Sequence, residues 1–286
     1  PCLDALIKNY GVAAVVTQPD RPRGRGKQTV FPPVKELALK NNIPVYQPEK
    51  AKDPEFIKRL KDINPDVIVV VAYGQILPES ILNIPRLGPI NVHASLLPKL
   101  RGAAPIQRSI INGDEKTGVT TMYMDEGWDT GDMIYQATTA VDPNENFSTL
   151  YSRLAELGGD LLIKTIEALA GGTAPRIAQN DDLAVLAPKL NPKLRLVDWN
   201  LPAQTIHNRV RVFAPSPGAE TSFNDETLKI IETRLVLENE PTGKPGEIIK
   251  LVKNSGILVG TGSQSLLITK LQPSGKKMMS ATDYAN

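Results

Sequence analysis

Short runs of β-branched and apolar residues alternate with amphipathic helical segments over about the first 172 residues of this chain. We predict strands at 12–17, 44–47, 67–72, 90–93, 119–124 and 134–140, and helices at 34–41, 54–63, 105–112 and 148–170. The run DVIVVVA is apolar without alternation, which is typical of a strand that is covered on both faces. Strands interleaved with helices predict an α/β domain with a doubly wound sheet.

The second half of the chain has a different character. Residues 173–202 are rich in Ala, Pro, Asn, Asp and Lys and show no sustained period, which is typical of an extended linker. Beyond them, IHNRVRVF predicts a helix, and four short runs predict strands: LKIIETRLV, EIIKLVK, GILVGTG and SLLITKLQP. Short strands at this spacing indicate a small β-barrel. We therefore expect a first domain at 1–178, a linker at 179–203 and a second domain at 204–286.

Composition matters here mainly for what it excludes. A net charge of only +2 argues against a general nucleic-acid coat, so any contact with nucleic acid must rest on local patches. The single cysteine, Cys2, cannot form an internal disulfide and fits a reducing, cytoplasmic setting. No apolar run approaches the roughly 18 to 20 residues of a membrane span, so we expect no membrane partner.

One of the two histidines stands in the segment GPINVHASLLP. If 90–93 is a strand, its alternation places Asn91 and His93 on one face. The site then lies where a strand gives way to a loop, which is where open α/β sheets bind ligands. The alternative is a structural histidine that only hydrogen-bonds to its neighbours.

A second segment, MDEGWDTG, follows another predicted strand and can bring Asp129 beside His93. A carboxylate next to an imidazole raises its basicity and orients it, and a nearby Asn can donate to an oxyanion. Together these groups suit the attack of a neutral amine on a carbonyl. They do not suit covalent catalysis, because Ser95 is too close along the strand to be placed against His93. Two distant histidines also make no metal-ligand cluster.

These motifs also carry a resemblance to a known family. INVHASLLPKLRGAAPIQ, followed by GDEKTGVTTMYMDEGWDTGDM, resembles the 10-formyltetrahydrofolate-dependent formyltransferases. The resemblance covers nearly the whole chain, including TQPDRPRGRGKQ, VVVAYGQILP and DWN, and RGAAPIQ is most similar to the branch that acts on initiator Met-tRNA. It implies a Rossmann-like catalytic domain and a smaller C-terminal, OB-like β-barrel domain that binds tRNA. We expect a cytoplasmic enzyme that is a monomer and holds no metal.

The resemblance implies roles for individual residues. Asn91 would stabilise the oxyanion, His93 would move protons, and Asp129 would tune and orient His93. The co-substrate 10-formyltetrahydrofolate would bind a set of residues from two segments: Ser95, Leu96, Leu97 and Pro98, together with Tyr73, Gln75, Ile76 and Leu77. The alternative for the second segment is a strand end that packs into the core.

Other functions remain open at this point. A relative in the same superfamily could formylate a sugar nucleotide amine or a purine precursor, and another could be an inactive folate- or RNA-binding protein. The intact set of Asn91, His93 and Asp129 argues against an inactive protein. Family members normally open with a strand and a GTP-x-F-A loop before the position of Pro1. We therefore expect this sequence to belong to a longer chain.

The segment RPRGRGK concentrates four cations in seven residues. Charge runs are usually solvated surface, but we expect this one to leave a strand of the sheet that also presents His93. The resemblance to the tRNA branch makes Arg23, Arg25 and Lys27 candidates for contact with the phosphates of the acceptor end.

Neutralising Arg25 and Lys27 together is expected to raise the KM for Met-tRNA and to flatten its dependence on salt concentration, because fewer counterions are released on binding. Initial rates over a salt series measure both effects, and folate affinity serves as the internal control. An unchanged salt dependence would mean that these cations hold something other than tRNA.

Overall fold

The computed structural model describes residues 1–23, 28–236 and 240–286. The chain folds into two compact units, each assembled from several segments. Unit 1 contains residues 1–103, 118–138 and 153–187, and unit 2 contains residues 104–117, 139–152 and 188–286. Among the described helices, none has the combination of length and apolar composition that would let it cross a membrane.

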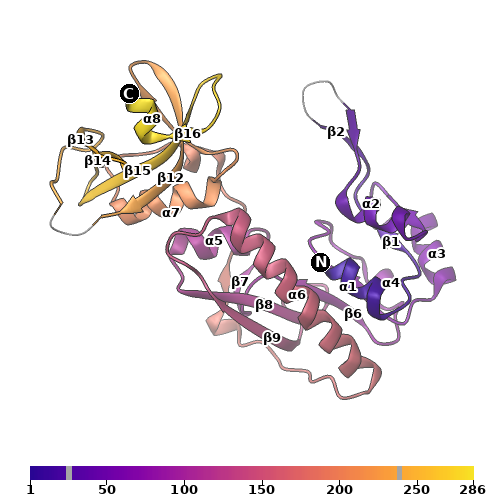
Figure 1. Ribbon diagram of the computed structural model, residues 1–286. Coiled ribbons are helices and arrows are strands. Elements are labelled where there is room, and N and C mark those ends of the chain that lie inside the picture. Colours follow the sequence, from indigo (N-terminus) through magenta and orange to yellow (C-terminus); the bar gives the residue numbers. More distant parts are fainter. Residues whose placement is uncertain (24–27, 237–239) are drawn as a thin grey trace. The chain divides into compact units, whose positions relative to one another are not determined.

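The strands of unit 1 form two main groups (Figure 1). Strand β1 (Val15–Val16) pairs in parallel with β4 (Val45–Tyr46). A four-stranded sheet follows the order β5 (Ile68–Val70), β6 (Pro89–His93), β8 (Lys116–Tyr123) and β9 (Met133–Ala140). Within it, β5 and β6 are parallel, whereas β6 and β8 are antiparallel. Because β5 and β6 are parallel, their carboxyl ends lie at the same edge of this sheet, which is where an α/β sheet offers ligand sites. The expectation that the strand before RPRGRGK belongs to the sheet with His93 is wrong, because β1 pairs with β4 in a separate sheet.

Helices α1 (Cys2–Asn9), α2 (Pro33–Lys40), α3 (Pro54–Ile63) and α4 (Glu79–Leu82) belong to unit 1. The limits of α3 follow from local chemistry. The Asp53 carboxylate accepts hydrogen bonds from the amides of Glu55 and Phe56, and Asn64 ends the helix with a left-handed φ of 48°.

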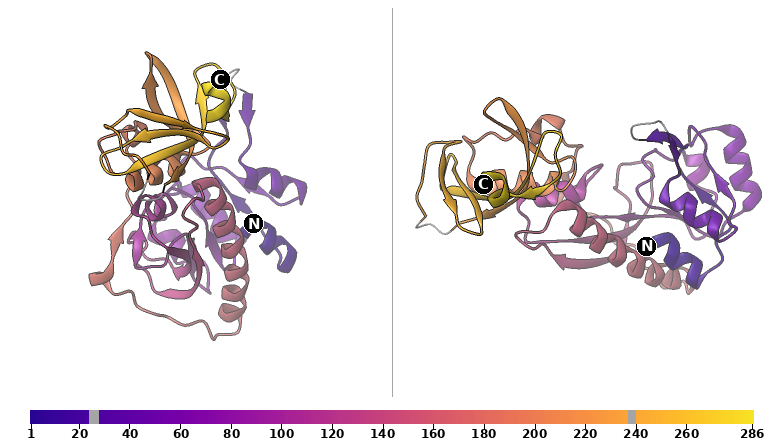
Figure 2. Two further views of the ribbon diagram at one scale, coloured as in Figure 1. Left: turned by 60° about the vertical axis from the view of Figure 1, so that its left-hand side comes forward. Right: turned by 45° about the horizontal axis from the view of Figure 1, so that its top comes forward.

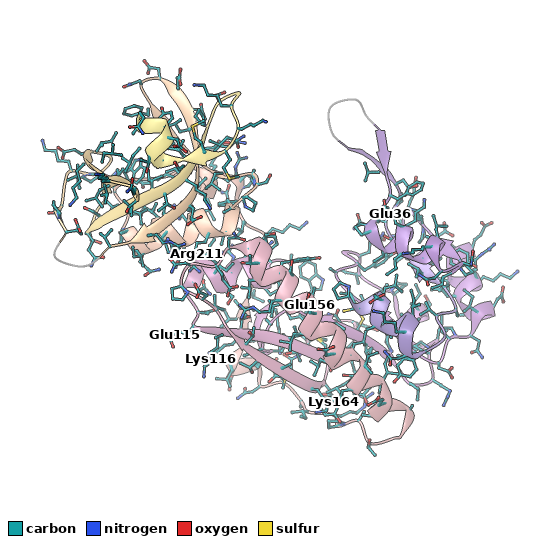
Figure 3. The ribbon with its side chains drawn as sticks, viewed as in Figure 1. Glu36, Glu115, Lys116, Glu156, Lys164 and Arg211 are labelled. Atoms are coloured by element: carbon teal, nitrogen blue, oxygen red, sulfur yellow. The ribbon has the colours of Figure 1, made fainter. Side chains whose placement is uncertain are left out.

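The long helix α6 (Phe147–Ala170) is amphipathic. Leu154, Leu161 and Leu162 are buried, whereas Glu156 and Lys164 are exposed (Figure 3). Gly158 lets the helix approach the sheet closely, because a Cβ there would lie 3.1 Å from Cγ1 of Val92.

Two smaller strand pairs complete unit 1. Strand β7 (Lys99–Arg101) pairs in parallel with β10 (Val185–Leu186). Strands β2 (Arg21–Arg23) and β3 (Gln28–Val30) are antiparallel. Of the cations expected to contact tRNA, Arg25 and Lys27 lie outside the described residues. Arg23 is described only as part of the backbone of β2.

Unit 2 is built on an antiparallel sheet (Figure 2). Its strands follow the order β11 (Ala219–Phe223), β12 (Glu226–Leu235), β15 (Ser265–Pro273), β14 (Gly256–Gly260) and β13 (Ile248–Val252), and β16 (Met279–Ser280) pairs with β15. Helices α5 (Pro105–Asn112), α7 (Ala203–Phe213) and α8 (Ala281–Ala285) complete the unit. Ile206 and Val210 of α7 share one buried core with the strands.

The segment predicted as a linker is extended but well packed. It contains two 3-10 turns, η1 (Asp181–Leu183) and η2 (Pro192–Arg195), in addition to β10. Within unit 1, the Ala187 amide donates to the Arg101 carbonyl at 2.7 Å. Within unit 2, Val197, Trp199 and Leu201 pack against the core. The low periodicity of this segment therefore does not mean that it lacks partners.

The predicted fold class is confirmed, with an α/β part followed by a smaller β part. All predicted strands and helices are present, and the limits of α3 and α5 match the predicted ranges. The α-helices and strands that were not predicted are two to five residues long: helices α4 and α8 and strands β2, β3, β7, β10, β11 and β16. Elements this short carry too few residues for a period to be visible.

A buried polar cluster lies in unit 2 around His207 of α7. The His207 ring lies 2.8 Å from the Thr233 hydroxyl through Nδ1 and 2.8 Å from the Pro143 carbonyl through Nε2. Because a carbonyl can only accept, Nε2 carries the hydrogen and the Thr233 hydroxyl donates to Nδ1. Burial, assisted by the charges of Arg211 and Arg234, lowers the pKa of His207 to about 4. The folded protein therefore holds this ring neutral.

Arg211 satisfies the backbone beside it. Its guanidinium group donates to the carbonyls of Asp142 and Glu145 at 3.1 and 3.2 Å, and to Oδ1 of Asn208 at 2.6 Å. These bonds fix the turn that supplies the Pro143 carbonyl to His207.

We expect unit 2 to lose stability as the pH falls from about 6.5 to about 4. In this window the unfolded chain protonates His207 and the folded chain does not, which costs roughly 3 kcal/mol over the whole interval. Urea unfolding at a series of pH values would measure the loss. His207→Gln cannot titrate, so its free energy of unfolding should fall less over the same window. Equal slopes for the two proteins would contradict a neutral, buried His207.

Candidate active site

Asn91 and His93 stand at the carboxyl end of β6, whose strand alternation directs both toward Asp129. Asn91 is half-buried, and only 6% of His93 is exposed. Nδ2 of Asn91 donates to Oδ1 of Asp129 at 3.2 Å, and Nδ1 of His93 lies 3.6 Å from Oδ2 of Asp129. The structure thus brings together the three residues that the sequence predicted as a set.

Backbone and turn geometry hold Asp129 in this position. Its own φ is 56°, in the left-handed region that few non-glycine residues adopt. The turn before it is closed by the Asp125 carboxylate, which accepts from the Gly127 amide at 3.0 Å and from the Thr130 hydroxyl at 2.8 Å. A Cβ at Gly131 would lie 1.9 Å from the Tyr123 carbonyl oxygen, so the loop can return to the sheet only with glycine there. The pattern DEGWDTG therefore specifies the turn as well as the carboxylate.

The environment of the His93 ring suits proton transfer. Nε2 of His93 lies 2.9 Å from the Leu100 carbonyl, while Nδ1 faces Asp129. Because a carbonyl oxygen can only accept, Nε2 carries the hydrogen in its contact with Leu100. The 3.6 Å between Nδ1 and Oδ2 of Asp129 is longer than a hydrogen bond. The second carboxylate oxygen of Asp129 also accepts from the Gly102 amide at 2.8 Å, which keeps it oriented.

Hydrogen bonds to the interior of the protein anchor the segment Ser95–Pro98. The Ser95 hydroxyl is buried and donates to the Lys99 carbonyl at 2.7 Å. The Thr120 hydroxyl donates to the Ser95 carbonyl at 2.7 Å and accepts from the Leu97 amide at 3.1 Å. The Leu97 side chain is 3% exposed, whereas Leu96 and Pro98 are half-buried. Of the four residues, only Leu96 and Pro98 keep side-chain surface that a ligand could touch.

The second predicted folate segment, 73–77, lies directly after β5. The Gln75 side chain accepts from the Ala51 amide at 2.8 Å, and Leu77 belongs to a buried core. Burial raises the pKa of the Tyr73 hydroxyl, which has no hydrogen-bond partner within the described part of the chain. Ile76 differs from its neighbours, since 64% of it is exposed. It is therefore the member of this segment that is best placed to meet a ligand.

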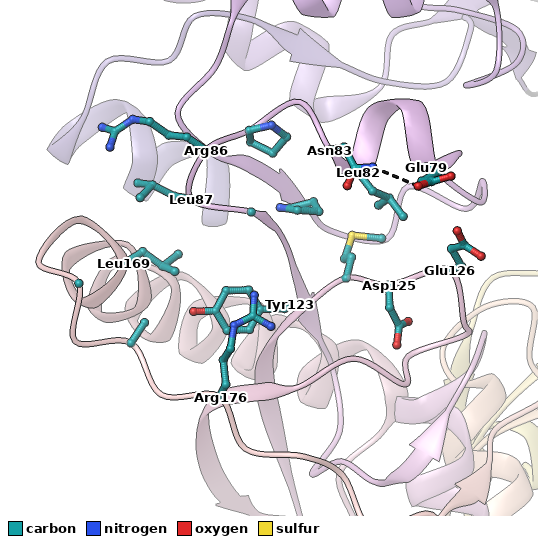
Figure 4. A pocket seen from close by; sticks show the side chains of 16 residues that line it. Glu79, Leu82, Asn83, Arg86, Leu87, Tyr123, Asp125, Glu126, Leu169 and Arg176 are labelled. Atoms are coloured by element: carbon teal, nitrogen blue, oxygen red, sulfur yellow. Dashed lines mark hydrogen bonds between the residues drawn. The ribbon is translucent and has the colours of Figure 1, made fainter.

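A cavity of about 690 Å³ opens at the other end of β6, where Pro89 begins the strand (Figure 4). Arg86 and Arg176 line it, and both already have carboxylate partners, Asp66 at 2.7 Å and Asp132 at 3.1 Å. Arg176 also stacks 3.8 Å above the Tyr123 ring. The cavity does not include Asn91, His93 or Asp129, so it is separate from the candidate active site.

The described residues contain no group of three or more His, Cys, Asp or Glu side chains placed to hold a metal ion. What the site does offer is an amide donor, an imidazole and a carboxylate in mutual contact. These groups can stabilise a negative oxygen and move a proton between two nitrogens. They can therefore support transfer of an acyl group between amines.

Several site residues were not predicted from the sequence. Thr120, Gln136 and Gln179 reach the site from segments that are distant along the chain. Nε2 of Gln136 donates to the Leu97 carbonyl at 2.8 Å, and Nε2 of Gln179 donates to the Asp129 carbonyl at 2.8 Å. Gln136 and Thr120 belong to strands, and Gln179 lies in the segment predicted as a linker. No local pattern distinguishes them from solvent-exposed polar residues.

Comparison with known proteins connects this site to a family. Residues 2–166 match the formyl transferase family, and residues 189–286 match the formyl transferase C-terminal domain. The methionyl-tRNA formyltransferase of Clostridioides difficile (strain 630) is 51% identical over 285 residues, which cover 99% of this chain and 92% of the relative. A methionyl-tRNA formyltransferase of Syntrophus aciditrophicus is 48% identical over 99% of this chain and 91% of that relative.

Solved structures agree at the level of the fold. The sugar 3N-formyl transferase WlaRD, solved in the presence of dTDP and 5-N-formyl-THF, has a TM-score of 0.67 and 22% identity over 96% of this chain and 94% of its own. Because the sequence matches span both parts and nearly the whole length, this chain belongs to the formyl transferase family, alongside the methionyl-tRNA formyltransferases that it matches.

Proposed function

We propose that this protein transfers a formyl group from 10-formyltetrahydrofolate to the α-amine of methionine on initiator tRNA, for use in translation initiation. The observation that carries the proposal is the contact of Asn91 and His93 with Asp129 in a chain that is 51% identical to a methionyl-tRNA formyltransferase. The protein acts as a cytoplasmic monomer in this proposal, and it needs no metal.

The reaction breaks the bond between the formyl carbon and N10 of the folate and forms a bond between that carbon and the methionine nitrogen. The attacking amine pushes the carbonyl electrons onto oxygen, which becomes negative. Nδ2 of Asn91 carries two hydrogens, and its bond to Asp129 uses one of them. The other hydrogen is the donor that we assign to the oxyanion.

The attacking amine must lose a proton, and the leaving N10 must gain one. His93 is the group that we assign to this transfer, because it stands beside Asn91 at the carboxyl end of β6 and an imidazole can both take up and release a proton. The nearby carboxylate of Asp129 keeps the ring in one orientation. Asp129 is in turn oriented by the Asn91 side chain and the Gly102 amide.

The co-substrate is proposed to contact the exposed Ile76 together with Leu96 and Pro98, while Ser95, Leu97, Gln75, Tyr73 and Leu77 shape the segments from within. The acceptor tRNA is proposed to contact Arg23, Arg25 and Lys27 and the basic residues of 204–286. Formylation of a sugar nucleotide is the second candidate, since WlaRD shares this fold. Its identity of 22% supports only the fold, whereas the tRNA-modifying relatives match along the full chain.

An assay with a choice of acceptors tests the proposal. Purified protein would receive 10-formyltetrahydrofolate with either initiator Met-tRNA or an amino-sugar nucleotide, and mass spectrometry would identify the formylated amine. Formyl-Met-tRNA is the expected product. Formylation of the sugar nucleotide alone would overturn the proposed acceptor.

His93→Ala is expected to lower kcat by about 10²- to 10⁴-fold, the range for loss of a general acid–base group. Asp129→Asn should also slow the reaction, since it replaces the carboxylate that faces the His93 ring and accepts from Asn91. Single-turnover formylation measures both effects. Glu126→Gln is the matched control, because this exposed carboxylate on the same loop should be dispensable. Near-normal turnover of both site variants would refute the assigned roles.

Ile76→Glu is expected to weaken folate binding roughly tenfold, because it removes apolar contact area worth ~1.4 kcal/mol and adds a charge beside the ligand. The exposed position of Ile76 means that folding should be unaffected. Leu39→Glu, at a similarly exposed position on α2, is the control. Equilibrium titration with a folate analogue gives both affinities. Equal affinities would place the folate elsewhere.

A further inference from the structure

We propose that Gln179, held by Arg101, is a positioning residue that fixes Asp129 for catalysis. The proposal rests on the proposed function for its activity measurements, but its structural basis is independent of the substrate. It assigns a catalytic consequence to a residue of the segment whose composition is typical of a linker.

Gln179 binds the backbone of the turn at two residues, Asp129 and Gly131. Its Nε2 donates to the carbonyl of Asp129 and to that of Gly131, both at 2.8 Å. These two bonds use both hydrogens of the amide nitrogen. Asp129 has a left-handed φ of 56°, a conformation that persists only where the surroundings impose it. Gln179 is the side chain that supplies this constraint at the carbonyls.

Arg101 in turn holds Gln179. Nε of Arg101 donates to Oε1 of Gln179 at 3.0 Å, which orients the amide so that its nitrogen faces the two carbonyls. A second guanidinium nitrogen donates to Oδ1 of Asp181 at 2.8 Å. Only 6% of Arg101 is exposed, so its geometry is fixed by packing as well as by these bonds.

Arg101 and the residue after it both contribute to holding Asp129. Gly102 follows Arg101 directly, and its amide donates to Oδ2 of Asp129 at 2.8 Å. One covalently continuous pair, Arg101 and Gly102, therefore controls Asp129 at two places: at its carboxylate through the Gly102 amide, and at its carbonyl through Gln179. Gly102 has a φ of 114°, and a Cβ there would lie 3.2 Å from the Ala187 carbonyl oxygen. The pair therefore packs closely against the segment that also contains Gln179.

These hydrogen bonds restrain the carboxylate oxygens of Asp129, on which the proposed formyl transfer depends. Asp129 must present one oxygen to Asn91 and the other toward His93, and a displacement of about 1 Å at a catalytic group can cost about a hundredfold in rate. Loss of Gln179 releases the turn, so the carboxylate moves relative to both partners. Gln179 is not among the residues proposed to contact folate or tRNA, so we expect the effect to fall on kcat.

The test compares Gln179→Leu with Gln179→Glu. Leucine removes the donors, and glutamate preserves the shape while placing acceptors against two carbonyls. Both variants are expected to lower kcat by about 10- to 100-fold, with the KM for Met-tRNA and for folate within about twofold of the wild type. Recovery of activity by Gln179→Glu would show that only side-chain volume matters and would overturn the proposal. Asp182→Asn, an exposed neighbour, is the control.

A double-mutant cycle with Asp129→Asn separates positioning from general structure. If Gln179 acts through Asp129, adding Gln179→Leu to Asp129→Asn lowers kcat by less than about twofold further. Multiplicative losses would show that the two residues act independently and would refute the proposal.

Hydrogen exchange at the Gly102 amide gives a readout that needs no activity. Exchange should accelerate in Gln179→Leu, because that amide loses its carboxylate partner when Asp129 moves. Unchanged exchange would overturn the positioning role. If the wild-type protein forms no formyl-Met-tRNA, the proposed function fails, and the exchange measurement still decides whether Gln179 holds Asp129.

Discussion

The arrangement of the site depends on one residue, Asp129, being held in a left-handed conformation between two strands. Its carboxylate is the shared acceptor for Asn91 and the Gly102 amide, and it faces the His93 ring. A single carboxylate on a loop could adopt many positions, so its usefulness depends on the bonds made by its own backbone. The sheet supplies the imidazole of His93 and the amide of Asn91, and the loop supplies the carboxylate that both of them face.

Much of this could be read from the sequence, and the reasons are local. Helix α3 has the limits predicted for it because Asp53 caps its start and Asn64 its end. The pairing of Asn91 with His93 follows from the period of a strand, which requires no knowledge of the rest of the fold. The turn that carries Asp129 was visible because its glycines and aspartates lie within a few residues of each other.

The remainder depends on contacts between distant residues, which leave no local pattern. Ser95 and Leu97 were predicted to face the folate, but whether their side chains point inward is decided by Thr120, which lies on another strand. Gln179 stands 50 residues after Asp129, in a segment with no hydrophobic period. From its composition we predicted that this segment is a linker. The hydrogen-bond partners of Gln179, Asp129 and Arg101, lie in other parts of the chain, so the segment itself carries no pattern that reveals them.

Unit 2 is assembled from segments that lie far apart in the sequence, and this has a consequence for folding during synthesis on the ribosome. Asn208 of α7 donates to the carbonyl of Ile111, 97 residues earlier, and His207 bonds to Pro143. At translation rates of about 5 to 20 residues per second, α5 emerges roughly 5 to 20 seconds before the helix that covers it. During that interval its apolar face, including Ile106 and Ile110, has no permanent partner from α7. The apolar face of α5 is therefore open to other partners during synthesis, until α7 itself has left the exit tunnel.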